Sequence, residues 1–151
     1  MPELPSSTSP SLTTPSAAQI NIALLLIRVA SALAFIYHGT AILFGGFGGP
    51  GPHGFAAYLQ MPDVVGYLVG LAQFAGGIAI LTGVLIRVGA ACAIIVMLGA
   101  IFLVHLPHGF NISAGGIEYA LTQLLIALAL LITGAGAYSL AGALPPGLRK
   151  L

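Results

Sequence analysis

The apolar positions of this chain fall into four long runs, separated by short stretches of glycine, proline and polar residues. The runs cover about residues 20–44, 64–85, 88–106 and 117–137. Each is close to the roughly 20 residues that a helix needs to cross the hydrocarbon core of a bilayer. Because backbone groups cannot stay unpaired in lipid, each run is predicted to be a transmembrane helix. The pattern predicts an all-α membrane protein with one domain over residues 19–140.

The tails and the first long loop have a different composition from the apolar runs. Residues 1–18 are rich in Pro, Ser and Thr, which predicts a disordered tail. Residues 141–151 form a short basic tail. The loop over residues 45–62 begins with glycines and prolines and continues into Phe55-Ala-Ala-Tyr58-Leu59. Aromatic residues beside the bilayer predict a short helix in the membrane interface.

The basic residues indicate the orientation of the helices. Arg87 lies between the second and third runs, and Arg149 and Lys150 follow the fourth. The loops over residues 45–62 and 107–116 contain no Lys or Arg. The positive-inside rule therefore predicts that both termini are cytoplasmic and that both loops are outside. An up-down bundle of four transmembrane helices is the simplest fold with this topology.

Composition supports the membrane assignment and excludes several classes of protein. The 151-residue chain is 58% hydrophobic and 5% charged, whereas soluble domains carry roughly 25% charged residues. A net charge of +1 is too small for a nucleic-acid-binding surface. The single cysteine, Cys92, excludes a disulfide within the chain and a four-cysteine iron–sulfur site.

Two polar residues interrupt the predicted helices. Arg28 lies about eight residues into the first run, where it either extends to the inner surface or is a buried cation with a polar partner. Gln73 shares a helix face with Gly66, Gly70 and Gly77, which predicts close helix packing on that face. Gln73 is therefore expected to face protein, within reach of Arg28, mainly as an interhelical hydrogen-bonding residue.

The segment from His105 to Ala120 concentrates polar groups between the third and fourth runs. His105 and Glu118 lie at its two ends, and His38 is near the outer end of the first run. We expect these three titratable groups to lie at the same outer level, where proton-coupled chemistry could use them. The alternative for Glu118 is a carboxylate that stabilises a helix start without chemistry.

A metal site was weighed against this interpretation. His38, His105, His108 and Glu118 have the right ligand types for zinc, and two histidines could hold a haem. The sequence lacks the Glu-x-x-His pairs of a di-iron bundle and any other diagnostic spacing. No metal site and no resident cofactor are predicted.

Several motifs resemble those of the DoxX family of small four-helix bacterial membrane proteins. The resemblance covers about residues 22–140 and is most specific between the third and fourth runs. Its motifs are Leu-Leu-Leu-Ile-Arg28, Phe-Ile-Tyr-His38-Gly39, Gly-Phe-Ala-Ala-Tyr58-Leu, Gly76-Gly77, Leu-Thr-Gly83, Arg87, Ile-Val-Met97, Val-His105-Leu-Pro-His-Gly-Phe110, Gly115-Gly116-Ile-Glu118-Tyr119-Ala120 and Tyr138-Ser139-Leu140.

The chain departs from the family pattern at two places. Gln73 stands where relatives usually have a glutamate just before the Gly-Gly pair, so a proton-carrying or Arg28-pairing role at that position is in doubt. Ala137 and Ala141 flank the Tyr-Ser-Leu motif, where relatives often have a basic and an acidic residue.

The resemblance implies a protein of the bacterial cytoplasmic membrane in a quinone-linked system, since some relatives are subunits of a thiosulfate:quinone oxidoreductase. His38, His105 and Glu118 are the candidate catalytic residues, and Arg28, Gln73 and Tyr119 are the candidates for binding quinone. The sequence shows no internal electron carrier, so a redox partner subunit is expected, and an oligomer is an open alternative.

Two other functions remain open at this point. The face formed by Gly66, Gly70 and Gly77 would suit a non-enzymatic scaffold that docks a partner subunit. Transport of a small solute has the intramembrane polar residues in its favour, but the chain lacks interrupted helices in corresponding positions.

Overall fold

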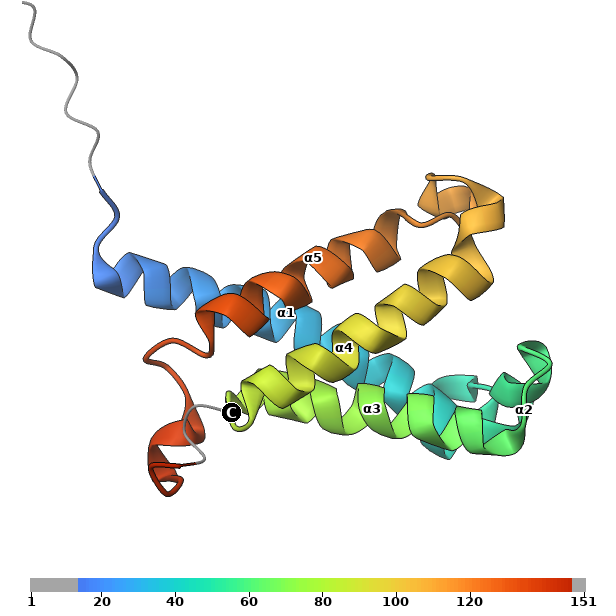
Figure 1. Ribbon diagram of the computed structural model, residues 1–151, viewed down its shortest axis with the longest axis horizontal. Coiled ribbons are helices and arrows are strands. Elements are labelled where there is room, and N and C mark those ends of the chain that lie inside the picture. The colour runs from blue at the N-terminus through green and yellow to red at the C-terminus, as the bar shows by residue number, and fades with distance from the viewer. Residues whose placement is uncertain (1–13, 148–151) are drawn as a thin grey trace, which may run out of the picture.

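The computed structural model describes residues 14–147, and every regular element in this range is helical. The main helices alternate in direction along the chain (Figure 1). They are α1 (Ala17–Phe44), α3 (Asp63–Thr82), α4 (Ile86–Ala100) and α5 (Glu118–Thr133). The all-α prediction is confirmed. Most of the predicted tails, residues 1–13 and 148–151, lie outside the described residues.

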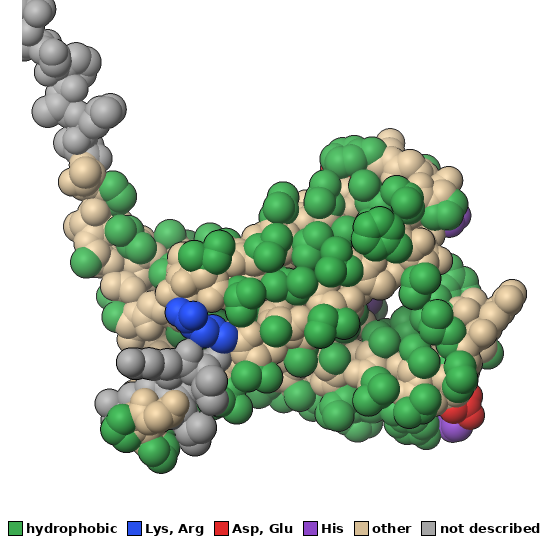
Figure 2. Space-filling view, viewed as in Figure 1, with side chains coloured by type: hydrophobic (Ala, Val, Ile, Leu, Met, Phe, Trp, Pro, Cys, Tyr) green, Lys and Arg blue, Asp and Glu red, His purple; other side chains and the backbone are tan. Residues whose placement is uncertain are grey.

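Three helical segments are long and apolar enough to cross a membrane: α1, α3 and residues 86–108, which extend α4. The exposed surface agrees with this assignment, since large side chains such as Leu26, Ile95 and Ile132 are 64%, 71% and 76% exposed. Figure 2 shows hydrophobic side chains spread over the sides of the molecule. An apolar surface of this extent needs lipid rather than water as its solvent. The chain is a multi-pass membrane protein.

The fourth helix is shorter than the sequence pattern predicted. We expected it to extend to about residue 137, but α5 ends at Thr133 after 16 residues. At 1.5 Å per residue α5 is about 24 Å long, compared with about 30 Å for the hydrocarbon core. Gly134 and Gly136 have φ of 75° and 70°, which turns the chain out of the helix. Apolar composition continues past this point, and therefore the hydropathy pattern missed the helix end.

The third helix changes its winding before it ends. After α4 the chain continues as a π-helical turn over Ile101–His105 and a 3₁₀ turn over Leu106–His108. The N–H of Leu106 bonds to the carbonyl of Ile101, five residues earlier. π-Helical turns are rare and are frequent at functional sites.

The segment between α1 and α3 contains the short helix that its aromatic residues predicted. This helix, α2, runs from Gly51 to Tyr58 and is preceded by a 3₁₀ turn over Gly46–Gly48. It contacts both α1 and α3, so it covers one end of that helix pair. The prediction that it lies in the membrane interface remains a prediction.

Glycines bring α1 and α3 into close contact. A Cβ atom on Gly77 would lie 2.8 Å from Cγ1 of Ile36, and one on Gly70 would lie 3.0 Å from Leu43. Gly39 of α1 packs directly on the backbone of Phe74. The predicted close-packing face of α3 is confirmed, and α1 occupies it along much of its length.

The helices pack in sequence order, α1 on α3, α3 on α4 and α4 on α5, with little contact between α1 and α5. Figure 1 shows the α4–α5 hairpin diverging from α1 and α3 toward the end that carries α2. The start of α1 and the segment after α5 lie together at the opposite end. We call these the open end and the clasped end, respectively.

We expect Gly39→Ala to destabilise the protein, because the added methyl group would meet the backbone of Phe74, which cannot move as a flexible side chain can. Overpacking of this kind costs about 1–3 kcal/mol. Thermal unfolding in detergent, followed by circular dichroism, measures the loss. Gly99→Ala is the matched control, since its Cβ would have nothing within 4 Å. Equal melting temperatures for the two variants would contradict the close packing of α1 on α3.

Candidate functional site

Arg28 is a buried cation that connects three parts of the chain at the clasped end. Its side chain is 1% exposed. Nε donates to the carbonyl of Ile80 at 2.9 Å, and Nη2 donates to that of Leu81 at 2.6 Å. Nη1 donates to the carbonyls of Ala135 and Tyr138 at 2.8 and 2.6 Å. Of the two sequence-based alternatives, the structure shows the buried cation, and its partners are backbone carbonyls rather than Gln73.

These carbonyls need an external donor. Ile80 and Leu81 belong to the last turn of α3, where the helix leaves its carbonyls unpaired and partially negative. Ala135 and Tyr138 lie in the irregular segment after α5, where the carbonyls are not paired within a helix. Irregular backbone is tolerated at membrane depth only when protein groups satisfy it. The guanidinium thus supplies a hydrogen-bond donor to four backbone carbonyls, and these four bonds offset the cost of burying its charge. We call this arrangement the Arg28 clasp.

A cavity of about 720 Å³ lies at the open end. Residues of α1, α2, α3, α4 and α5 line it, together with the π-helical turn and the loop before α5. Most of the lining is apolar, including Ile95, Met97 and Leu103. Five lining residues carry polar groups on ring or amide side chains: His38, Tyr58, Gln73, His105 and Tyr119. All of them except Tyr58 are candidate site residues from the sequence.

His105 is held in a defined orientation at the cavity wall. Its Nδ1 lies 2.6 Å from the carbonyl oxygen of Gly115. Because a carbonyl oxygen only accepts hydrogen bonds, Nδ1 must carry the proton. The neutral ring therefore offers Nε2 as an acceptor, and the protonated ring offers it as a donor. The π-helical turn places His105 where both the cavity and Gly115 are in reach.

His38 and Tyr119 face each other across the cavity wall from α1 and α5, with ring centres 6.3 Å apart. Behind them, Ser31 donates to Oε1 of Gln123 at 2.8 Å, and Gln123 also bonds the side chain of Tyr119. Both Ser31 and Gln123 are buried. Gln123 is not among the site residues predicted from the sequence. The polar spacing of Tyr119 and Gln123, one helical turn apart, was the available signal.

Gln73 is buried on α3, with a side chain that is 6% exposed. Within residues 14–147 its amide has no hydrogen-bonding partner, although it lines the cavity. A buried amide that faces a cavity is available to bond a ligand. The expected interhelical hydrogen bond of Gln73 is not formed.

Glu118 does not line the cavity with the histidines. Its carboxylate accepts a hydrogen bond from the N–H of Ile112 at 3.0 Å, at the start of α5. His108 is likewise engaged locally, with Nδ1 3.0 Å from the carbonyl of Val104. The structure therefore brings His38 and His105 to one cavity and leaves Glu118 at the start of α5, in the position of a helix-start carboxylate.

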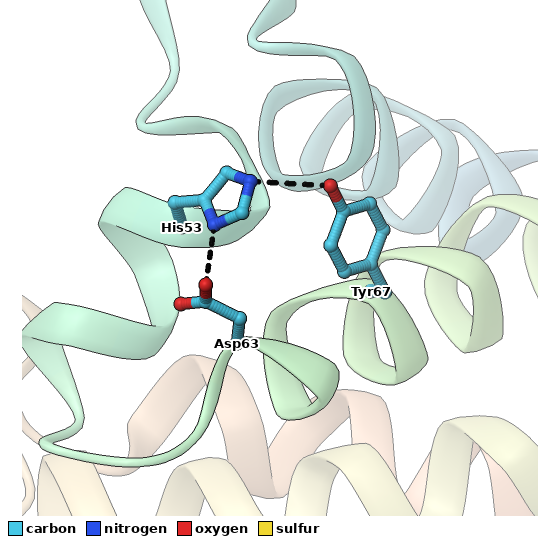
Figure 3. A network of polar contacts seen from close by, with 3 residues as sticks. All are labelled: His53, Asp63 and Tyr67. Carbon is cyan, nitrogen blue, oxygen red and sulfur yellow. Dashed lines mark hydrogen bonds and ion pairs between the residues drawn. The ribbon is translucent and has the colours of Figure 1, made fainter.

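A second polar cluster, which the sequence did not predict, lies on the surface between α2 and α3 (Figure 3). Nδ1 of His53 is 2.7 Å from the Asp63 carboxylate, and Nε2 is 3.2 Å from the Tyr67 hydroxyl. The side chains of His53 and Asp63 are 66% and 62% exposed, and an ion pair at such exposure adds little stability. Its geometric effect is to hold α2, which contributes Phe55 and Tyr58 to the cavity lining.

The part of the chain that the structure describes contains no group of three His, Cys, Asp or Glu side chains arranged to hold a metal ion. The four residues considered for zinc are thus not brought together.

The fold and the cavity define a multi-pass helical membrane protein with a ligand-sized cavity inside its apolar bundle. The sequence model of the DoxX family matches residues 23–106, more than half of the chain. The protein belongs to the DoxX family. The match includes Arg28, His38, Gln73 and His105, whereas Tyr119 and Glu118 lie beyond it. Neither a curated protein nor a solved structure matches this chain.

We expect Arg28→Lys to lower the melting temperature in detergent. Lysine has three donors without a fixed fork, so at least one of the four carbonyls loses its partner, at a cost of about 1–3 kcal/mol. Arg87→Lys is the matched control, because Arg87 is exposed and makes no hydrogen bond within residues 14–147. Its effect should stay within about 0.5 kcal/mol. Unchanged melting of Arg28→Lys would contradict the clasp.

Proposed function

We propose that this protein binds a lipid-soluble quinone in the open-end cavity, as a membrane component of a quinone-linked oxidoreductase system. The observation that carries the proposal is the oriented His105 ring in an apolar cavity that also holds His38, Gln73 and Tyr119. The redox context of the proposal rests on the resemblance to relatives that are subunits of a thiosulfate:quinone oxidoreductase. Quinone is the proposed substrate.

The dimensions and lining of the cavity support this ligand class. Its volume of about 720 Å³ lies within the roughly 300–1,000 Å³ of small-molecule sites, which are mostly apolar with a few placed polar groups. A quinone ring carries two opposed carbonyl oxygens, so it needs hydrogen-bonding groups on two sides. The polar residues belong to α1, α3, α5 and the π-helical turn, and thus surround the cavity.

The polar residues have separate proposed roles. His105 bonds one quinone oxygen through Nε2, and the Gln73 amide or His38 bonds the other. Tyr119, positioned by Gln123, adds a hydroxyl donor. Reduction of a quinone to a quinol takes up two electrons and two protons. His38 and His105 are the proposed proton donors in the cavity, and Glu118 exchanges protons with the outer aqueous phase from the neighbouring hairpin.

Arg28 takes a positioning role in this proposal rather than a binding role, because all its observed partners are backbone carbonyls at the clasped end. The sequence contains no motif for an internal electron carrier. We therefore propose that a redox partner subunit exchanges electrons with the bound quinone.

The proposed location is the bacterial cytoplasmic membrane, with the clasped end and both termini in the cytoplasm. Figure 2 shows basic side chains at the clasped end, whereas acidic and histidine side chains lie at the open end. This distribution agrees with the positive-inside rule. The proposed quinone site would then be near the outer surface.

The scaffold hypothesis loses its motivating observation. Its glycine face packs inside the protein: Gly70 and Gly77 contact α1, and Gly66 packs against Pro52 of α2. A partner subunit could not dock on that face without displacing these helices. The quinone proposal uses residues that remain accessible from the cavity.

The test is quinone binding to the purified protein in lipid nanodiscs, measured by isothermal titration with a short-chain ubiquinone analogue. We expect His105→Ala to weaken binding about tenfold, the equivalent of roughly one hydrogen bond. His108→Ala is the matched control, since its Nδ1 also bonds a backbone carbonyl but its ring does not line the cavity. That control should bind as the wild type does.

Gln73→Leu provides an independent variant, because it removes no hydrogen bond within the described residues. We expect a weakening of about fivefold with an unchanged melting temperature. Binding by the wild type, His105→Ala and Gln73→Leu with the same affinity would refute a quinone site in this cavity.

A further inference from the structure

A second cavity, of about 360 Å³, lies at the clasped end. The start of α4 contributes Ile86 and Arg87, and the segment after α5 contributes Gly134, Gly136 and Ser139. This cavity is at the opposite end of the bundle from the proposed quinone site and shares no lining residue with it. It therefore needs a separate explanation.

Positive charge at this end is not neutralised by the described part of the chain. Arg28 bonds only neutral carbonyls, and Arg87 has neither an ion pair nor a hydrogen bond within residues 14–147. The described carboxylates, Asp63 and Glu118, begin α3 and α5 and so lie at the open end. Two cations near one cavity without a facing carboxylate create a field that favours an anion.

The cavity also offers hydrogen-bond donors. Arg87 is exposed, and the Cβ position of Gly134 is 4.0 Å from its Nη2, so its guanidinium lies at the cavity wall. The Ser139 hydroxyl has no partner within the described residues. Ser139 also lies beside the Arg28 guanidinium, since a Cβ on Gly83 would be 2.5 Å from Cβ of Ser139 and 2.8 Å from Nη2 of Arg28.

We propose that this cavity binds a phosphate group, with the Arg87 guanidinium and the Ser139 hydroxyl as its donors. A guanidinium binds phosphate oxygens through two parallel hydrogen bonds, and a serine hydroxyl adds a third. Arg87 begins the α4 membrane helix, so the site is at the level where phospholipid headgroups lie. The phosphate belongs either to an anionic phospholipid or to a free phosphate ion.

The site is tested with the full chain in detergent, by native mass spectrometry with added phosphatidylglycerol and, separately, phosphatidylcholine. We expect phosphatidylglycerol to bind at least about tenfold more tightly, because its net negative charge is not cancelled by a choline. Arg87→Gln should weaken phosphatidylglycerol binding about tenfold, and Ser139→Ala about threefold. Arg87→Lys keeps the charge without the fork, so its affinity should fall between those of the wild type and Arg87→Gln.

Two further measurements distinguish a lipid phosphate from a free phosphate ion and test whether any nearby positive charge would suffice. If inorganic phosphate displaces the lipid more than potassium chloride of equal ionic strength does, the site accepts free phosphate. If it does not, the site is specific for the lipid headgroup. Arg149→Gln removes a cation from the basic tail and should change binding less than about twofold.

The proposal is wrong if Arg87→Gln and Arg149→Gln weaken binding equally, because the lipid is then attracted only by diffuse charge. It is equally wrong if neither phosphatidylglycerol nor inorganic phosphate binds, or if Arg87→Gln leaves the affinity unchanged. Thermal unfolding of each variant, followed by circular dichroism, distinguishes a loss of affinity from a loss of folded protein.

Discussion

The bundle depends on the hydrogen bonds between one buried guanidinium, that of Arg28, and four backbone carbonyls. An arginine is expensive inside a bilayer, and so is a backbone segment that has left its helix. In this protein the same hydrogen bonds reduce both costs, because Arg28 donates to carbonyls at the end of α3 and in the segment after α5. The close approach of Gly83 leaves no room for a side chain there. One side chain of α1 thereby connects α3 to the segment after α5.

The helices are held together at the clasped end and diverge at the open end. The helices pack tightly where small residues meet, as at Gly39 and Gly77, and Arg28 secures the same helices at the clasped end. Toward α2 the α4–α5 hairpin separates from α1 and α3 and encloses the larger cavity. The polar residues of the two ends consequently have different surroundings. At the clasped end Arg28 bonds backbone carbonyls, and at the open end His38, Gln73, His105 and Tyr119 line the cavity.

The apolar runs were sufficient to predict the main helices. Aromatic residues predicted the short helix between α1 and α3, and helical spacing predicted the glycine face of α3. Helical spacing also placed Gln73 inside the protein. The partners of Arg28 could not be predicted, because backbone carbonyls carry no sequence signal. The end of α5 was missed because glycine and alanine continue the apolar run past Thr133. Glu118 was grouped with the histidines by helix level alone, whereas a local bond to Ile112 holds its carboxylate in the hairpin.

The π-helical turn at Ile101–His105 decides where the His105 side chain lies. Each residue of an α-helix rotates the chain by about 100°, so a single deletion inside the turn would restore regular winding and redirect His105. The helix before it would keep its register against α3, because the change acts only downstream. A change of length at this point would therefore move His105 relative to the cavity and would also alter the connection to α5. The orientation of His105 at the cavity is thereby set by a single helical turn that lies at the other end of the bundle from the Arg28 clasp.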